Sequence, residues 1–363
     1  MGDTAMVELR LRPYHDASGA VFRSDAGWEV PTGYGPLDAE VRAVRTRAGV
    51  IDRSDRAKVR VTGADRVTFL DGLVTADMKT LVEGMSAYAL VLNEKSRVLG
   101  DLRVYAFSDA FVMDIDAGQK DAVLRHLEKH LVSDDVAFED LAACGHIEVH
   151  GPASGDLVAA GLGADVRGLA LDAFRTVPID KKHEAHAAHV RGTGEAGFAI
   201  WSAGTSLADV WERLERRGAA PIGRDAWEVL RIEAGIPRVG ADMTGETLAL
   251  EVAPAHAISF TKGCYVGQEV VARGTYVGHM NRKLTGLRIE GDLPPNPGDR
   301  VRTGGRDVGF VTSGTWSTTL GWAIALALMR LDALSAGSPL FVDRGGWDLR
   351  ASVHAIPFVR GRV

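Results

Sequence analysis

The chain has 363 residues, of which 46% are apolar, and it carries a formal net charge of -6. This length exceeds the size at which a single hydrophobic core keeps growing, so two or three domains are expected. Acidic residues outnumber basic ones, so the chain lacks the excess of Lys and Arg that is typical of nucleic-acid-binding proteins, and no nucleic-acid partner is predicted. No apolar run reaches the ~20 residues that span a bilayer, so no membrane span is predicted.

In the first half of the chain, predicted strands and helices do not alternate regularly. The apolar spacing of residues 37–48 predicts a helix that ends at Gly49, and further helices are expected over 65–73 and 120–131. Alternation of apolar and polar residues predicts strands over 57–63, 86–92, 98–107, 110–115 and 143–150. This irregular mixture indicates layered α+β domains.

The middle of the chain repeats this kind of pattern, and the last part changes to strands alone. Strands are expected over 174–179 and 195–201, followed by helices over 206–217 and 224–234, the second of which ends at Gly235. From residue 283 onward, proline and glycine separate short predicted strands, which indicates a small closed β domain. These strands cover residues 283–289, 299–302, 306–313, 323–328, 339–342 and 349–354.

A cysteine between two glycines is the most informative local feature. In the run Lys262-Gly263-Cys264-Tyr265-Val266-Gly267-Gln268-Glu269, the glycines permit close approach of a ligand, and the lysine favours a thiolate if it lies near the sulfur. The alternative is a short turn with a buried, inert cysteine. Cys144 is the only other cysteine, so a disulfide framework is excluded, and the absence of a signal-peptide pattern favours the cytoplasm.

Two carboxylates are candidate site residues. Asp101 follows Gly100 in a predicted strand with apolar neighbours, where burial of an unpaired carboxylate is costly, unless strand alternation turns it to water. Glu195 lies in a glycine-rich run, 192–197, that has the letters of a dinucleotide fingerprint, but a strand instead of a helix follows it, which argues against nicotinamide binding. The turn could instead present Glu195 to a guanidine-like or aminopyrimidine edge, or simply to solvent.

Three histidines, His183, His186 and His189, are spaced by three, and imidazole triads do bind zinc. Lys181 and Lys182 adjoin them, which favours a solvated face over a metal site. No metal is predicted.

Several motifs occur in a fixed order over nearly the whole chain, and together they resemble those of the glycine-cleavage T-protein (aminomethyltransferase) superfamily. They are Gly27-Trp28-Glu29-Val30-Pro31 and the runs 45–54, 92–102, 193–198, 230–235 and 312–317. The resemblance implies an α+β fold, a three-domain cloverleaf with two ferredoxin-like α+β domains and a C-terminal β-barrel. The expected boundaries are 1–145 for the first, folate-binding domain, 146–282 for the second, which carries the KGCYVGQE motif, and 283–363 for the barrel.

The resemblance also implies tetrahydrofolate as the cofactor and assigns roles to particular residues. By position, Asp101 matches the catalytic aspartate beside the folate, and Glu195 matches the carboxylate that recognises the pterin. Tyr88 and Arg231 are further cofactor-binding candidates, as a wall and a polar contact. Where a typical T-protein has two consecutive aspartates, this chain has Gly100 followed by Asp101.

The segment from Lys262 to Glu269 is instead similar to the signature of the YgfZ-type branch, folate-binding proteins that support iron–sulfur enzymes and tRNA thiomodification. The sequence therefore favours a folate-binding accessory protein for an iron–sulfur client enzyme, with Cys264 as the functional thiol. The alternative is a tetrahydrofolate-dependent aminomethyl or methyl transferase that uses Asp101 and a lipoyl carrier protein or a small methylated compound. A scaffold that has lost folate is a third possibility, against which the presence of both Asp101 and Glu195 argues.

Overall fold

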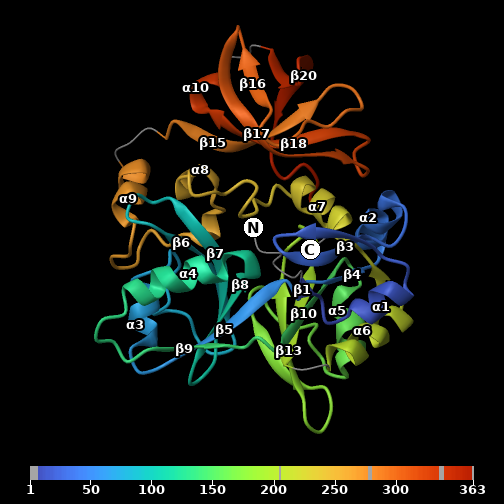
Figure 1. Cartoon of the computed structure of the whole chain (residues 1–363), viewed down its shortest axis with the longest axis vertical. Helices are drawn as coiled ribbons and strands as arrows, with labels where there is room; N and C mark the ends of the chain where they lie inside the picture. Colours follow the sequence, from blue (N-terminus) through green and yellow to red (C-terminus); the bar gives the residue numbers. More distant parts are fainter. Residues whose placement is uncertain (1–6, 204–205, 277–279, 335–338, 362–363) are drawn as a thin grey trace.

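The computed structural model describes residues 7–203, 206–276, 280–334 and 339–361 of the chain. Two parts built of sheets and helices lie side by side, and a β-barrel lies across them (Figure 1). The predicted α+β fold, with a three-part cloverleaf and a C-terminal barrel, is confirmed.

The first α/β part is a five-stranded antiparallel sheet in the order β6-β7-β8-β5-β9. Helices α3 (Arg66–Asp71) and α4 (Ala117–Lys129) pack on one face, where Val59, Leu102 and Val123 belong to one apolar core. Since side chains alternate along a strand, the next residues of each strand face the other way. The strands are β5 (Arg56–Thr62), β6 (Ser86–Leu92), β7 (Val98–Ala106), β8 (Phe111–Asp116) and β9 (Ala137–Asp140).

The second α/β part is a six-stranded sheet in the order β11-β12-β13-β10-β4-β14. Its strands are β4 (Gly49–Asp52), β10 (Cys144–His150), β11 (Phe174–Pro178), β12 (Glu184–Val190), β13 (Gly197–Ala203) and β14 (Ala220–Pro221). Because β4 pairs with β10, this sheet takes strands from both sides of residue 145.

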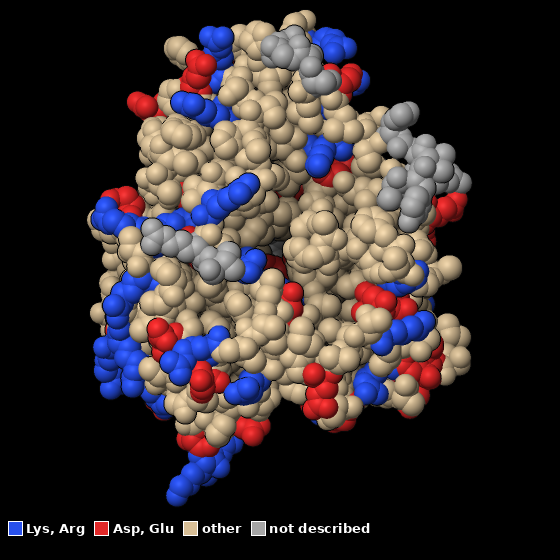
Figure 2. Space-filling model, turned by 180° about the vertical axis from the view of Figure 1, so that it is seen from behind, with Lys and Arg blue, Asp and Glu red and all other residues tan. Residues whose placement is uncertain are grey.

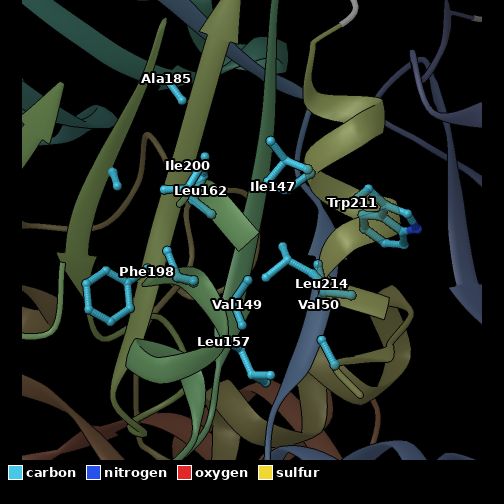
Figure 3. Close-up of a cluster of buried hydrophobic side chains, with 14 of the residues drawn as sticks. Val50, Ile147, Val149, Leu157, Leu162, Ala185, Phe198, Ile200, Trp211 and Leu214 are labelled. Atoms are coloured by element: carbon cyan, nitrogen blue, oxygen red, sulfur yellow. The ribbon is translucent and has the colours of Figure 1, made fainter. Parts of the chain in front are cut away.

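Helices α5 (Ser154–Leu162) and α6 (Leu207–Arg216) cover one face of this second sheet. In α6 the apolar residues Leu207, Val210, Trp211 and Leu214 recur at helical spacing and form one buried stripe. Figure 3 shows Trp211 and Leu214 facing strand residues that include Ile147, so this stripe and the sheet form one core.

Two helices and a small sheet pack beside the second part. Helix α2 (Leu37–Thr46) packs against α7 (Arg224–Glu233), which also contacts β3. The small sheet, in the order β1-β3-β2, consists of β1 (Val7–Glu8), β2 (Val21–Asp25) and β3 (Trp28–Gly33), and helix α1 (Arg12–Ala17) lies between its first two strands in sequence.

The C-terminal part is a closed barrel in the order β15-β18-β17-β16-β19-β20, so that it has no free edge. Its strands are β15 (Arg282–Ile289), β16 (Arg300–Thr303), β17 (Arg306–Ser317), β18 (Trp322–Arg330), β19 (Leu340–Arg344) and β20 (Trp347–His354), with α10 (Leu331–Leu334) after β18. A linking segment with α8 (Ala249–Val252), η1 (Ala255–Ala257) and α9 (Gln268–Tyr276) precedes the barrel. Among the described residues, no helix is both long and apolar enough to cross a membrane.

The three closely spaced histidines do not form a solvated helical face, and that expectation is wrong. His186 and His189 lie in strand β12, where a spacing of three places side chains on opposite faces. The His186 ring lies 4.0 Å from the Trp201 ring, and the His189 ring stacks on Phe198 at 5.3 Å.

The two α/β sheets meet through buried charged side chains. Lys58 of β5, which is 1% exposed, donates to Asp114 of β8 at 3.2 Å and to the ring of His146 in β10 at 3.1 Å. Asp114 also accepts a hydrogen bond from Arg56 at 2.7 Å. Burial, together with the nearby Lys58 charge, lowers the pKa of His146 to about 3, so its ring is neutral and can accept from the ammonium group.

A second ionic group joins α2 to the second part and to the barrel. Arg45 of α2 donates to Glu195 at 2.5 Å and to Glu233 at the end of α7. Glu233 also accepts from Ser317 at 2.5 Å and from Thr319 at 3.0 Å, both in the barrel. Both carboxylates are buried, and the Arg45 guanidinium offsets the cost of removing their charges from water.

We expect Arg45→Met to lower the free energy of unfolding by about 3–5 kcal/mol, since it removes the guanidinium group that pairs with two buried carboxylates. Arg42→Met is the matched control on the same helix, because the ion pair of Arg42 with Asp38 is exposed and contributes at most about 1 kcal/mol. Urea unfolding monitored by tryptophan fluorescence measures both changes. Equal shifts for the two variants would contradict the role given to Arg45.

Candidate functional site

Asp101 lies on β7, on the face of the first sheet that points away from helix α4. Its carboxylate accepts a hydrogen bond from the Tyr88 hydroxyl of neighbouring strand β6 at 2.8 Å. Both side chains are half-buried, so strand alternation does not turn Asp101 fully to water. The structure thus brings together two of the residues that the sequence singled out.

The pKa of Asp101 is raised above its ordinary value, mainly because burial disfavours the charged form. The Arg56 charge and the Tyr88 hydrogen bond oppose this shift, while Asp116 and Asp114 add to it. Burial also raises the pKa of Tyr88 well above its usual range, so its hydroxyl remains a donor. The pair therefore offers a carboxylate that can hold or release a proton beside a permanent hydrogen-bond donor.

Gly100, which stands where a typical T-protein has the first of two aspartates, faces helix α4. A Cβ atom at this position would lie 2.7 Å from Cγ2 of Val123 and 3.0 Å from Oε1 of Gln119. The close approach of α4 therefore explains why this position holds a residue without a side chain. Because neighbouring strand residues face opposite ways, the glycine does not alter the face on which Asp101 lies.

Two further polar side chains, which the sequence analysis missed, accompany Asp101 and Tyr88. Arg103, two residues along β7, donates to Ser86 at 3.0 Å and to Asp172. His256 of η1 places its ring 5.8 Å from the Tyr88 ring. A single histidine in the run Pro254–Ala257 carries no pattern that separates it from any other histidine, so only the packing of η1 on β6 reveals it.

Glu195 lies in the turn between β12 and β13 and is 1% exposed, so it is not a surface glutamate. Gly194 has φ +79°, a conformation that favours glycine, and the chain passes so close to Ala234 that a Cβ atom would lie 2.7 Å from that side chain. This turn directs the carboxylate to Arg45. A pterin at Glu195 would therefore compete with a guanidinium group.

Arg231 of α7 is 1% exposed and occupies a network that binds α7 to the barrel. Its guanidinium donates to Glu228 at 2.9 and 2.6 Å, to Asp242 at 2.7 Å, to the Ile236 carbonyl at 3.1 Å and to Ser313 at 2.8 Å. These bonds engage each N–H donor of the group. A folate contact at Arg231 would require one of these bonds to be replaced.

The lysine of the cysteine motif bonds the first part of the molecule. The Lys262 ammonium donates to the carbonyls of Asp71, Val74 and Ala76, the last two at 2.9 and 2.8 Å, and its side chain is 1% exposed. It therefore satisfies backbone acceptors just after α3. Cys264 itself is exposed, so the alternative of a buried cysteine is wrong.

The rest of the motif ties the linking segment to the first sheet. Gly267 has φ +84°, and a Cβ atom there would lie 2.7 Å from the Asn93 carbonyl oxygen. Its own carbonyl accepts from Ser96, and the Val266 N–H donates to Gly72 at 3.0 Å. Cys264 is thus held at a fixed place on the surface.

Seen from behind, the molecule has a narrow hollow near its middle, where the barrel meets the two α/β parts, with acidic and basic side chains at its border (Figure 2). A separate open groove of about 890 Å³ is lined by residues 139–144, 178, 180–184, 186 and 201–203. That groove contains neither Asp101 nor Glu195. We place the candidate site at Asp101, because the Asp, Glu and Lys residues that line the groove are exposed, whereas Asp101 is half-buried with a raised pKa.

Comparison with known proteins identifies relatives along the whole chain. The family model GCVT N-terminal domain matches residues 11–262, and the glycine cleavage T-protein C-terminal barrel domain matches residues 282–360. A protein named aminomethyltransferase from Rubrobacter xylanophilus is 33% identical over 348 residues, with 95% of this chain and 92% of that protein covered. One of the same name from Synechococcus sp. (strain RCC307) is also 33% identical, with 92% and 94% covered.

A solved structure gives the same result. The glycine cleavage system aminomethyltransferase T from Bartonella henselae superposes with a TM-score of 0.90 at 25% identity, with 98% of each chain covered. The similarity thus includes both α/β parts and the barrel.

The two glycines of the cysteine motif are expected to differ in their response to alanine. Gly267→Ala should lower the free energy of unfolding by about 1–3 kcal/mol, because it forces a side chain into a positive-φ position against the Asn93 carbonyl. Gly263→Ala is the control, since no atom lies within 4 Å of its Cβ position. Urea midpoints compare the two, and a larger loss at position 263 would contradict the structural account.

The raised pKa of Asp101 predicts the pH dependence of stability. Since the folded state binds this proton more tightly than the unfolded state, the Asp101 contribution to stability falls as the pH rises above the ordinary value of 3.8. Asp101→Asn should therefore gain stability relative to wild type between about pH 4 and about pH 7. Urea unfolding of wild type and Asp101→Asn at both pH values tests this, with Asp121→Asn on the exposed side of α4 as the control. If the difference in unfolding free energy between wild type and Asp101→Asn is the same at both pH values, the prediction is refuted.

Proposed function

The chain belongs to the glycine cleavage T-protein family, and we propose that it is a tetrahydrofolate-dependent transferase of an aminomethyl group. The observation that carries this proposal is the half-buried Asp101 carboxylate, hydrogen-bonded by Tyr88, and the sequence resemblance assigns the role of catalytic aspartate to this residue. Relatives over nearly the full length are named aminomethyltransferase, which supports the same reaction class.

The residues around Asp101 fit a reduced pterin. A flat, amine-bearing ring system needs an acceptor for its N–H groups and apolar ring faces on which to lie. The Asp101 carboxylate supplies the acceptor, and the ring of Tyr88 supplies a flat surface beside it. Bound tetrahydrofolate supplies the nitrogen atoms that accept the one-carbon unit.

In the proposed reaction, Asp101 stabilises positive charge that develops at the transferred carbon. A carboxylate that is already in place on a strand needs no reorganisation at the moment of reaction, which is the main advantage of a preorganised site. Tyr88 fixes the orientation of Asp101, and the ion pair of Arg103 with Asp172 closes the polar side of the cluster. Water exclusion by the half-buried setting strengthens these interactions.

The donor in this proposal is an aminomethyl group carried by a lipoyl carrier protein, which is the partner that family membership implies. Glu195 and Arg231 stay candidate folate contacts. Their present partners, Arg45 for Glu195 and four groups for Arg231, favour a supporting role in which they hold the parts of the molecule together.

A second candidate function rests on Cys264. Its exposed thiol, on a segment that Lys262 and Gly267 fix to the first part, could serve a folate-binding accessory protein that contacts an iron–sulfur client enzyme. In that case the thiol, and not Asp101, would carry the activity.

We expect Asp101→Ala to reduce folate-dependent aminomethyl transfer at least ~100-fold, because it removes a preorganised charge, while Cys264→Ser leaves the rate unchanged. Transfer from an aminomethyl-lipoyl carrier to tetrahydrofolate is the assay, and calorimetric titration with tetrahydrofolate reports binding separately. The reverse pattern, or a wild type that binds folate but transfers nothing, would favour the accessory function. No binding by the wild type would refute both.

A further inference from the structure

The short helix η1 places a third ionisable group at the candidate site. The His256 ring lies 5.8 Å from the Tyr88 ring at an interplanar angle of 50°, and Tyr88 in turn bonds Asp101. The His256 side chain is exposed, and its nitrogens make no hydrogen bond within the part of the chain that the structure describes. Both imidazole nitrogens are therefore available to a bound molecule.

A buried hydroxyl group fixes this position. Thr75, which is 0% exposed, donates to the Ala257 carbonyl at 2.5 Å and accepts from the Leu90 N–H at 2.8 Å. Its carbonyl also accepts from the Ser259 N–H at 2.9 Å. Leu90 stands directly across from Asp101 in the β6–β7 register. One side chain thus holds both η1 and the strand next to Asp101, which keeps His256 and Asp101 in a defined relation.

The groups that act on His256 come from two strands and a turn. Tyr88 of β6 contacts its ring, Arg103 of β7 and Asp172 in the turn before β11 are the charges that act on it, and Asp101 is reached through Tyr88. Burial lowers the pKa of His256, Asp172 opposes this, and Arg103 adds to it. At neutral pH the imidazole is therefore mainly uncharged, with one nitrogen that accepts a proton and one that donates.

We propose that His256 is a catalytic residue of the aminomethyl transfer, where it takes up a proton and delivers it to the departing amine. This inference rests on the proposed function. In the overall reaction, the carbon loses its bonds to sulfur and to the amine nitrogen and forms two bonds to nitrogens of the acceptor. Those nitrogens lose two protons, and the sulfur and the amine gain one each, so that thiol and ammonia leave without any oxidation or reduction.

Two basic groups suit this exchange better than one. Asp101, as a carboxylate, stabilises positive charge while the new bonds form, whereas the uncharged His256 accepts one of the two protons and then returns to its neutral form when the amine leaves. General acid–base transfer of this kind contributes about 10²–10⁴-fold to a rate.

The test uses the full chain with His256→Gln and His256→Ala, and His183→Gln in the β11–β12 connection as control. We expect kcat to fall at least ~100-fold in both His256 variants, with less than ~3-fold change in calorimetric affinity for tetrahydrofolate. An unchanged kcat overturns the proposal. A loss of affinity for tetrahydrofolate as large as the loss of kcat also overturns it, because His256 would then act by binding the pterin ring and not by transferring a proton.

A readout that does not need turnover is the NMR signal of the His256 imidazole in wild type, titrated with pH in the presence and absence of 5-formyltetrahydrofolate. We expect its midpoint to lie below the ordinary pKa of histidine and to move when the folate binds. No movement on binding overturns the proposal. If the wild type neither binds folate nor transfers, the proposed function fails and this inference fails with it, whereas an active wild type with equally active His256 variants refutes this inference alone.

Discussion

The pairing of buried charges between the two α/β sheets is the constraint on which the candidate site depends. Asp114 holds both Arg56 and Lys58, and Lys58 reaches across to His146 in the other sheet. Removing charges from water is costly unless each has a partner with good geometry, so these side chains have little freedom to move. Arg56 is thereby fixed as the main positive charge acting on Asp101.

This arrangement explains why the site lies on strands and not on loops. Strand alternation assigns Gly100 to the helical face of the first sheet and Asp101 to the other face, so the contacts with α4 and the chemistry of Asp101 do not interfere with each other. His256, which η1 contributes, is held next to the same strand pair by the Thr75 hydroxyl. Strands and one anchored short helix therefore preorganise the site.

The cysteine motif divides into a structural part and an exposed thiol. Lys262, Gly267 and Val266 all contact the first sheet or the residues after α3, which accounts for three of its positions without any reaction. The exposed Cys264 thiol is not explained in this way. Membership of the T-protein family and the geometry of Asp101 therefore support transfer as the primary proposal, and the motif alone does not reverse it.

The fold class could be predicted from the sequence, because hydrophobic periodicity is a local property of the chain. The apolar stripe of α6 and the short strands after residue 282, which proline and glycine separate, are both visible in the order of the amino acids. The sequence also singled out Asp101 and Tyr88. Three features became visible only in the folded chain. Arg45 donates a hydrogen bond to Glu195, and Arg231 donates to Asp242, Ser313 and other partners. His256 lies beside Tyr88. Each of these contacts joins residues that are far apart in the sequence. Such contacts form because buried charged and polar groups need partners, and no local sequence pattern predicts which partner each group finds.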